Sequence, residues 1–281
     1  SVARPALALL LATTASAALA QTEAAPATPE ALSAAVAAET YVERIRALDD
    51  AGPVLNSVIV YNPDAAIVAA TMADRPLAGR TVLVKDNVET AEWPTTAGSL
   101  ALADNATGRD APMIAALRRN GGVVLGKTNL SEWANIRADN STSGWSAVGG
   151  LTKNPYATDR NTCGSSSGSG AAIAAGLAWG AIGTETNGSI TCPASINGLV
   201  GFKPSVGIVS RTHVVPISST QDTAGPMTKT VYDAALLLNA IAGEDPGDPV
   251  TLGARRVADY TAGLDTASLA GVRIGVMRGA V

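Results

Sequence analysis

Apolar positions along this chain fall into two kinds of segment, short continuous runs and longer stretches with a helical repeat. Continuous aliphatic and β-branched runs predict strands at residues 54–61, 81–85 and 123–127. Apolar residues three to four positions apart predict helices at residues 29–48, 64–72, 110–120 and 230–242. Because strands and helices alternate, we expect an α/β fold in which a mixed β-sheet is covered by helices on both faces.

Other segments have less regular patterns. Residues 171–182 are apolar all round, which predicts a core helix that is too short to span a bilayer. We expect a helical turn at residues 131–136, a loop at 139–150 and a turn at 156–161. Residues 271–277 predict one more strand of the sheet. Since a domain rarely finishes on an uncovered strand, we expect that the C-terminal part of the domain is missing from this sequence.

The first residues have the pattern of an export signal. Arg4 precedes an apolar run at residues 6–12, and an A-x-A cleavage site lies at residues 18–20. A membrane span is the alternative, but the apolar run is short and a polar segment follows it. We therefore expect a signal peptide at residues 1–20, a linker at 21–28 and one domain at 29–281. Thr28 is the expected N-cap of the first helix, with Pro29 at its first position. The protein would be periplasmic or secreted, with no stable membrane insertion after cleavage.

Composition narrows the class of protein. With 281 residues, 47% of them hydrophobic and 16% charged, the chain can bury a substantial core. Its net charge of -4 gives no reason to expect a nucleic-acid partner. The two cysteines, Cys163 and Cys192, are too few for a zinc site or a disulfide framework. An exported protein could pair them, but we expect two small buried thiols.

Candidate chemistry lies in two serine-containing loops and one lysine. The loops have the sequences GSSSGSG (residues 164–170) and GTETNGS (183–189), and Lys85 ends the apolar run at 81–85. A lysine usually points to solvent, but burial would lower its pKa and leave a neutral amine that accepts a proton. These residues favour a hydrolase that uses two serines and a lysine, because His213 is the sole histidine.

A nucleophile elbow is a weaker interpretation of the first loop. The pattern G-x-S-x-G places Ser166 at its centre, but an elbow follows a strand, and residues 156–161 look turn-like. Enzymes with a nucleophile elbow have their catalytic residues in the chain order Ser, Asp, His. No Asp lies between Ser166 and His213 to complete this order. His213 is expected to be structural. No S-x-x-K motif occurs, which excludes the penicillin-binding type of Ser-Lys enzyme.

Several motifs, taken in order, resemble those of the amidase signature family over about residues 31–276. They are VLVKDN (82–87), PTTAGS (94–99), GKTNLSE (126–132), GSS (164–166), GTETNGSI (183–190) and GLVGFKP (198–204). The resemblance implies the family's mixed α/β fold and hydrolysis of an amide through an acyl-serine. No metal or cofactor is implied.

The resemblance also assigns roles to residues. Lys85 matches the family's base, Ser165 the bridging serine that follows a cis peptide bond, and Ser189 the nucleophile. The backbone N–H groups of the expected oxyanion hole belong to Thr186, Asn187, Gly188 and Ser189. This chain departs from the family at Asn187, where many members have Gly or Asp, and at Ser167, where many have Gly. Asp222 is a family-like turn residue with no expected chemistry.

The sequences around these motifs indicate a substrate class. SEWAN (131–135), SGWS (143–146) and CGSSSG (163–168) are most similar to bacterial peptide amidases, which remove the C-terminal amide of peptides. The expected partner is a small-molecule or peptide amide. Three alternatives remain: an aryl-acylamidase or esterase of the same family, an amidotransferase subunit, which the export signal argues against, and an inactive truncated fragment or binding module.

Overall fold

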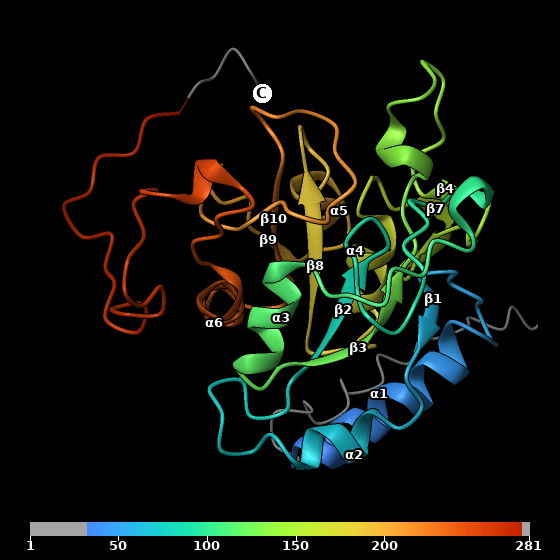
Figure 1. Cartoon of the computed structure of the whole chain (residues 1–281), viewed down its shortest axis with the longest axis horizontal. Helices are drawn as coiled ribbons and strands as arrows, with labels where there is room; N and C mark the ends of the chain where they lie inside the picture. The colour runs from blue at the N-terminus through green and yellow to red at the C-terminus, as the bar shows by residue number, and fades with distance from the viewer. Residues whose placement is uncertain (1–32, 277–281) are drawn as a thin grey trace, which may run out of the picture.

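The computed structural model describes residues 33–276, which are built around one six-stranded sheet (Figure 1). The strand order is β1-β3-β2-β8-β10-β9. The three central strands run parallel, while β1, β10 and β9 pair antiparallel with their neighbours. The strands are β1 (Val58–Tyr61), β2 (Thr81–Lys85), β3 (Val123–Thr128), β8 (Gly180–Glu185), β9 (Val200–Gly201) and β10 (Thr223–Thr228). The predicted mixed sheet is confirmed.

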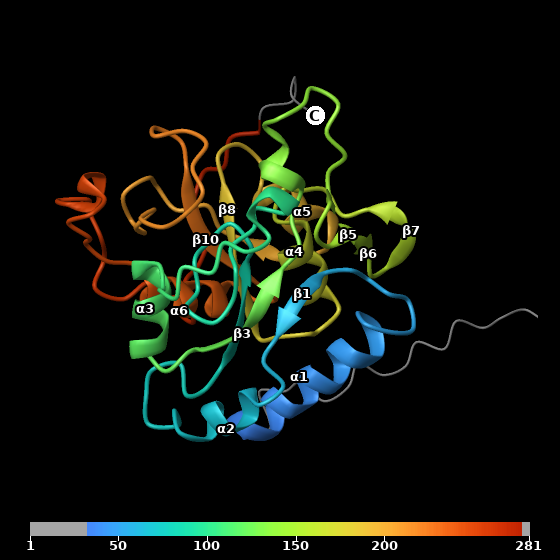
Figure 2. The same cartoon turned by 45° about the vertical axis from the view of Figure 1, so that its right-hand side comes forward.

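Helices pack on both faces of this sheet. The helices are α1 (Ala34–Leu48), α2 (Ala65–Ala70), α3 (Pro112–Arg119), α4 (Ser167–Ala174), α5 (Thr191–Ile196) and α6 (Val231–Ile241). Helices α3 and α6 contact each other on one face, α4 packs across the central strands, and α1 and α2 lie together at one end (Figures 1 and 2). Short 3-10 turns are η2 (Leu100–Leu102), η3 (Glu132–Asn135) and η4 (Pro249–Thr251). No helix within residues 33–276 is long and apolar enough to cross a bilayer.

The central strands are buried along their whole length, which explains their continuous apolar runs. Every residue of β2, β3 and β8 is buried. Three fully buried polar or charged residues, Lys85, Lys127 and Thr128, lie at the carboxyl ends of β2 and β3. Buried polar groups are costly unless they find partners, so this end of the sheet is where chemistry is expected.

The predicted helix at residues 171–182 is wrong in its second half. Helix α4 begins at Ser167, ends at Ala174 and is followed by Gly176 at φ +68°, a backbone conformation that favours glycine. The chain then enters strand β8 at Gly180. A segment that is apolar all round gives the same pattern for a buried helix and a buried strand, so periodicity could not separate them.

Two further boundaries differ from prediction. Helix α1 begins at Ala34, capped by Ser33, rather than at Pro29; Thr28, the signal and the linker lie outside the described residues. The expected turn at 156–161 contains strand β7 (Ala157–Asn161), which pairs with β6 (Lys153–Asn154).

Two expected irregular or extended segments also differ. The expected loop at 139–150 includes β4 (Trp145–Ser146), paired with β5 (Gly150–Leu151). The described residues 272–276 form no strand and are exposed, so the predicted strand at 271–277 is wrong over that part. An isolated apolar run forms a strand only where a sheet edge is available to pair with it.

Candidate active site

Lys85 lies in a fully buried position at the end of β2, and its amine contacts only uncharged groups. Nζ lies 2.7 Å from Ser165 Oγ, 2.9 Å from Thr184 Oγ1 and 3.2 Å from Thr184 O. Burial lowers the pKa of Lys85 from its ordinary value to about 7, against the opposing pull of Glu185 and Asp222. Of the two cases that the sequence left open for Lys85, the structure shows the buried one.

Ser165 is held by the loop before α4. Its peptide bond to Gly164 is cis, its carbonyl accepts the N–H of Ser131 at 3.0 Å, and its side chain is fully buried. A Cβ on Gly164 would come within 2.3 Å of Ser131 Oγ, which explains the need for glycine before the serine. The structure thus brings Ser165 to Lys85 across 80 residues of sequence.

Ser189 lies in the turn between β8 and α5, next to the Ser165 loop. The N–H of Ser166 donates to the Ser189 carbonyl at 3.1 Å, so the two serine loops are joined through their backbones. Ser189 itself is half-buried. The three predicted catalytic side chains therefore come from neighbouring segments of one site.

Glu185 organises the Ser189 turn and was not expected from the sequence. Its carboxylate accepts the N–H groups of Gly188 at 2.8 Å, Ile190 at 2.7 Å and Thr191 at 2.9 Å. Burial works to raise the pKa of this carboxyl, but those N–H groups together hold it below its ordinary value. A carboxylate three to six residues before the N–H groups of a turn and a helix start is a local signal that could have identified this role.

Gly188 is the one predicted oxyanion donor that the structure contradicts. Its N–H is already donated to Glu185 and is not free to meet a developing oxyanion. Thr186 is tied in another way, because its hydroxyl donates to Asp222 at 2.5 Å and its carbonyl accepts from Lys203 at 2.5 Å. Asn187 is exposed on the same turn. The backbone N–H groups of Thr186, Asn187 and Ser189 remain as candidates.

Ser166 has a structural role. Its hydroxyl donates to Thr184 O at 3.1 Å and accepts the Thr184 N–H at 3.2 Å, so it ties α4 to β8. The strand β7 removes one sequence argument against a nucleophile elbow, but a hydroxyl engaged in this way cannot serve as its nucleophile. Ser167, where many members of the family have Gly, is buried at the start of α4.

Cys163 and Cys192 form a disulfide, with their Cα atoms 5.9 Å apart. The prediction of two free buried thiols is therefore wrong. Both residues lie beside the serine loops, which folding brings together although 29 residues separate them. The sequence showed that neighbourhood but not the relative placement of the two loops, which decides whether cysteines can pair.

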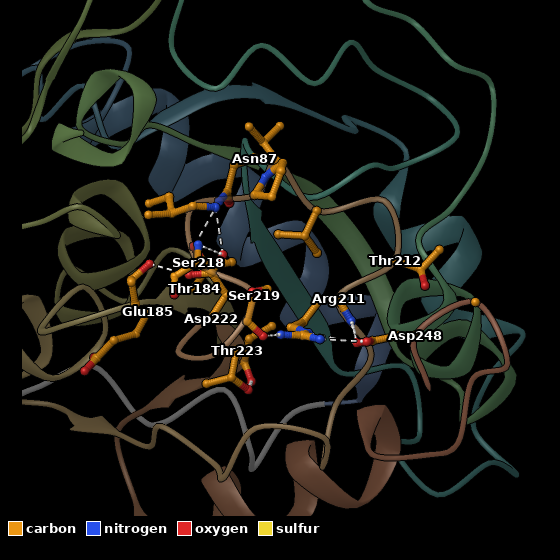
Figure 3. Close-up of a pocket in the computed structure, with 17 residues that line it drawn as sticks. Asn87, Thr184, Glu185, Arg211, Thr212, Ser218, Ser219, Asp222, Thr223 and Asp248 are labelled. Atoms are coloured by element: carbon orange, nitrogen blue, oxygen red, sulfur yellow. Dashed lines mark hydrogen bonds and ion pairs between the residues drawn. The ribbon is translucent and has the colours of Figure 1, made fainter. Parts of the chain in front are cut away.

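A cavity of about 270 Å³ opens beside Thr184 and Asn87 (Figure 3). Asn87 donates to Thr184 Oγ1 at 2.9 Å, and Thr184 in turn contacts Lys85. On the other side, Arg211 lies between Asp248 and the carbonyl of Ser219, at 2.7 and 2.6 Å. Lys85 does not line the cavity itself, and Thr184 lies between the cavity and the buried amine.

Asp222 and His213, for which the sequence predicted no catalytic role, both contact neighbouring residues. Asp222 Oδ2 accepts the N–H groups of Ile217 and Ser218, and its charge acts on Lys85. It thus contributes more than the turn role predicted for it. His213 Nδ1 lies 3.9 Å from Glu89 Oε2, on a partly exposed side chain. This contact agrees with a structural role.

Comparison with known proteins shows the family of this chain. The family model named Amidase matches residues 37–281. A probable amidase of Arabidopsis thaliana is 45% identical over 254 residues, which cover 85% of this chain and 49% of that protein. A glutamyl-tRNA(Gln) amidotransferase subunit of Nitratidesulfovibrio vulgaris is 43% identical over 240 residues, covering 85% of this chain and 44% of that protein. The chain belongs to the Amidase family.

A solved structure agrees with this assignment. The native peptide amidase from Stenotrophomonas maltophilia is 53% identical, with a TM-score of 0.78. The match covers 82% of this chain and 49% of that one. The chain thus spans about half the length of the relatives it matches. The amidase signature resemblance and the mixed sheet with helices are both confirmed.

Proposed function

We propose that this protein hydrolyses a carboxylic amide through an acyl-serine, with Lys85 as base, Ser165 as proton bridge and Ser189 as nucleophile. The observation that carries the proposal is the contact of a fully buried amine with a buried serine hydroxyl at 2.7 Å. A pKa near 7 makes about half of Lys85 neutral at pH 7, which suits a general base.

The hydrogen bonds around Lys85 support this direction of proton flow. Thr184 O can only accept, and Thr184 Oγ1 already accepts from Asn87. A neutral amine has two N–H groups to donate and one lone pair. It can donate to the two oxygens of Thr184 and accept the proton of Ser165.

The chemical steps then balance with water as the one further reactant. Lys85 takes the Ser165 proton while Ser165 takes that of Ser189, and Ser189 Oγ bonds to the amide carbon. The C–N bond breaks as the leaving nitrogen receives the proton back through Ser165. Water, activated by the same relay, releases the acid. Backbone N–H groups that meet the oxyanion would each contribute about 3–4 kcal/mol.

The favoured substrate is a peptide with a C-terminal amide, which gives the free acid and ammonia. The 53% identity to the Stenotrophomonas peptide amidase supports this choice. We also propose that the protein is exported, on the pattern of residues 1–20. Cell fractionation with sequencing of the mature N-terminus tests the export; a cytoplasmic protein that still carries residues 1–20 would refute it.

The decisive experiment measures ammonia release from a peptide amide, with an anilide and an ester of the same acyl group beside it. Ser189→Ala should abolish turnover and labelling by a fluorophosphonate, while Ser195→Ala, on the exposed side of α5, should leave both intact. Mapping the labelled serine to any residue other than Ser189 would refute the assignment. Faster turnover of the ester or the anilide would instead indicate an esterase or an aryl-acylamidase of the same family.

A second candidate is glutamine hydrolysis by an amidotransferase subunit. The 43% identity to such a protein favours it. Both reactions break a carboxamide C–N bond, so they share the proposed relay. Ammonia release from free glutamine, in the absence of activity on peptide amides, would favour this candidate.

A further inference from the structure

Two lysines are fully buried at the carboxyl ends of adjacent strands, and their partners differ. Lys85 ends β2, and Lys127 lies one residue before the end of β3. The register pairs Val84 with Lys127, so Lys127 leaves the sheet on the face opposite to Lys85, because successive side chains alternate. The sheet therefore separates the two amines.

Lys127 has a carboxylate partner. Its Nζ lies 2.9 Å from Asp86 Oδ1, in a pair whose side chains are only 1% and 2% exposed. Nζ also donates to Thr95 Oγ1 at 3.0 Å. Asp86 Oδ2 accepts from the backbone and hydroxyl of Thr96. Oδ1 has no other polar partner among residues 33–276.

Lys85, by contrast, touches no carboxylate. Its three contacts are hydroxyl and carbonyl oxygens. Yet Asp86 is the next residue along the chain and is as deeply buried. An uncompensated buried carboxylate is costly and stabilises a cation nearby. Among the described residues, the charged group in contact with Asp86 is Lys127.

We propose that Lys127 is a positioning residue for the reaction, which neutralises Asp86 on the far face of the sheet so that Lys85 can remain an uncharged amine. The inference rests on the proposed function, in which Lys85 is the base. Lys127, in the motif GKTNLSE, would thus act on the reaction without taking part in any of its steps.

Other charged groups face both amines. Glu185 and Asp222 act on Lys85 from β8 and from the start of β10. Burial lowers the pKa of Lys127, while Asp86 opposes this first and Glu89 and Glu92 act in the same sense as Asp86. All of these remain when Lys127 alone is replaced, so the change isolates the pairing with Asp86.

The test compares Lys127→Met, Asp86→Asn and the double variant by the acid limb of kcat/KM and of fluorophosphonate labelling. Lys127→Met should move both limbs to higher pH by about 1 unit, since one more unpaired carboxylate favours the ammonium. Activity at pH 6 should then fall about tenfold and recover above pH 9. The double variant should return the limb to its wild-type position. Asp86→Asn should give no upward shift.

An unshifted limb in folded Lys127→Met, or an upward shift that persists in the double variant, would overturn the inference. If Lys127→Met does not fold, the double variant and Asp86→Asn still decide, because any upward shift in either contradicts it. Failure of the proposed function looks different. In that case the Lys85→Ala variant, with Lys127 and Asp86 unchanged, would keep its activity.

Discussion

Cys163 lies two residues before Ser165, Cys192 lies three residues after Ser189, and the two cysteines are bonded to each other. One covalent bond therefore joins the segments that hold Ser165 and Ser189, the proposed bridge and the proposed nucleophile. The N–H of Ser166, donating to the carbonyl of Ser189, is the non-covalent counterpart of this bond.

Reduction of the disulfide should lower both stability and activity. A bond that closes a loop of 29 residues contributes about 3–4 kcal/mol by limiting the unfolded chain. Dithiothreitol should lower Tm by about 10 °C and slow fluorophosphonate labelling. The variant with Cys163→Ser and Cys192→Ser should resemble the reduced protein and respond no further to reductant. A wild-type protein with unchanged Tm and labelling after verified reduction would contradict the prediction.

Removal of the Lys85 amine should stabilise the fold at neutral pH while it abolishes activity. The folded pKa of about 7 lies below the ordinary value of 10.5, so the unfolded chain binds more protons between these pH values. Burial of Lys85 therefore costs the folded state most at and below pH 7, and this cost vanishes as pH rises through 10.5.

The measurement is urea unfolding of Lys85→Met against wild type at pH 7 and pH 10. The gain in free energy of unfolding should be on the order of 4 kcal/mol at pH 7 and clearly smaller at pH 10. Wild-type activity should decline below about pH 7, where the amine is protonated. A gain that is equal at both pH values would show that Lys85 keeps its ordinary pKa.

Sequence reasoning identified the strands that carry the site because β2 and β3 are short, buried and bounded by polar residues. It located Lys85 at the end of β2 for the same reason. It missed the end of α4 at Ala174 because an all-apolar segment does not reveal its period. The disulfide was missed because it depends on how two loops fold against each other, which no local pattern encodes. Glu185 was missed although the N–H groups it accepts lie only three to six residues further along the chain.

Gly168 should tolerate no side chain. A Cβ there would lie 2.3 Å from Ser57 O and 2.6 Å from both the N and O atoms of Asn129, all of them backbone atoms. Gly168→Ala should therefore destabilise the protein by about 1–3 kcal/mol, since α4 must move from the sheet. Gly243→Ala is the matched control, because nothing lies within 4 Å of its added Cβ. Thermal unfolding of both variants measures the effect, and equal Tm values would refute it.

Glu185→Gln should impair the Ser189 turn and shift the pH profile at once. The amide group of Gln cannot accept all three N–H bonds that the carboxylate receives from Gly188, Ile190 and Thr191. We expect kcat to fall about 10- to 100-fold, because misplacing Ser189, the proposed nucleophile, costs orientation. The acid limb should also move to lower pH, because Glu185 raises the pKa of Lys85.

Two readouts separate these effects of Glu185. Glu185→Asp keeps the charge but shortens the side chain, so it should lower kcat with little movement of the limb. Glu185→Gln should lower kcat and also move the acid limb to lower pH. The pH profiles of kcat/KM for the two variants measure the difference. A limb that stays in place in Glu185→Gln would remove Glu185 from the electrostatics of Lys85 and leave it with the turn alone.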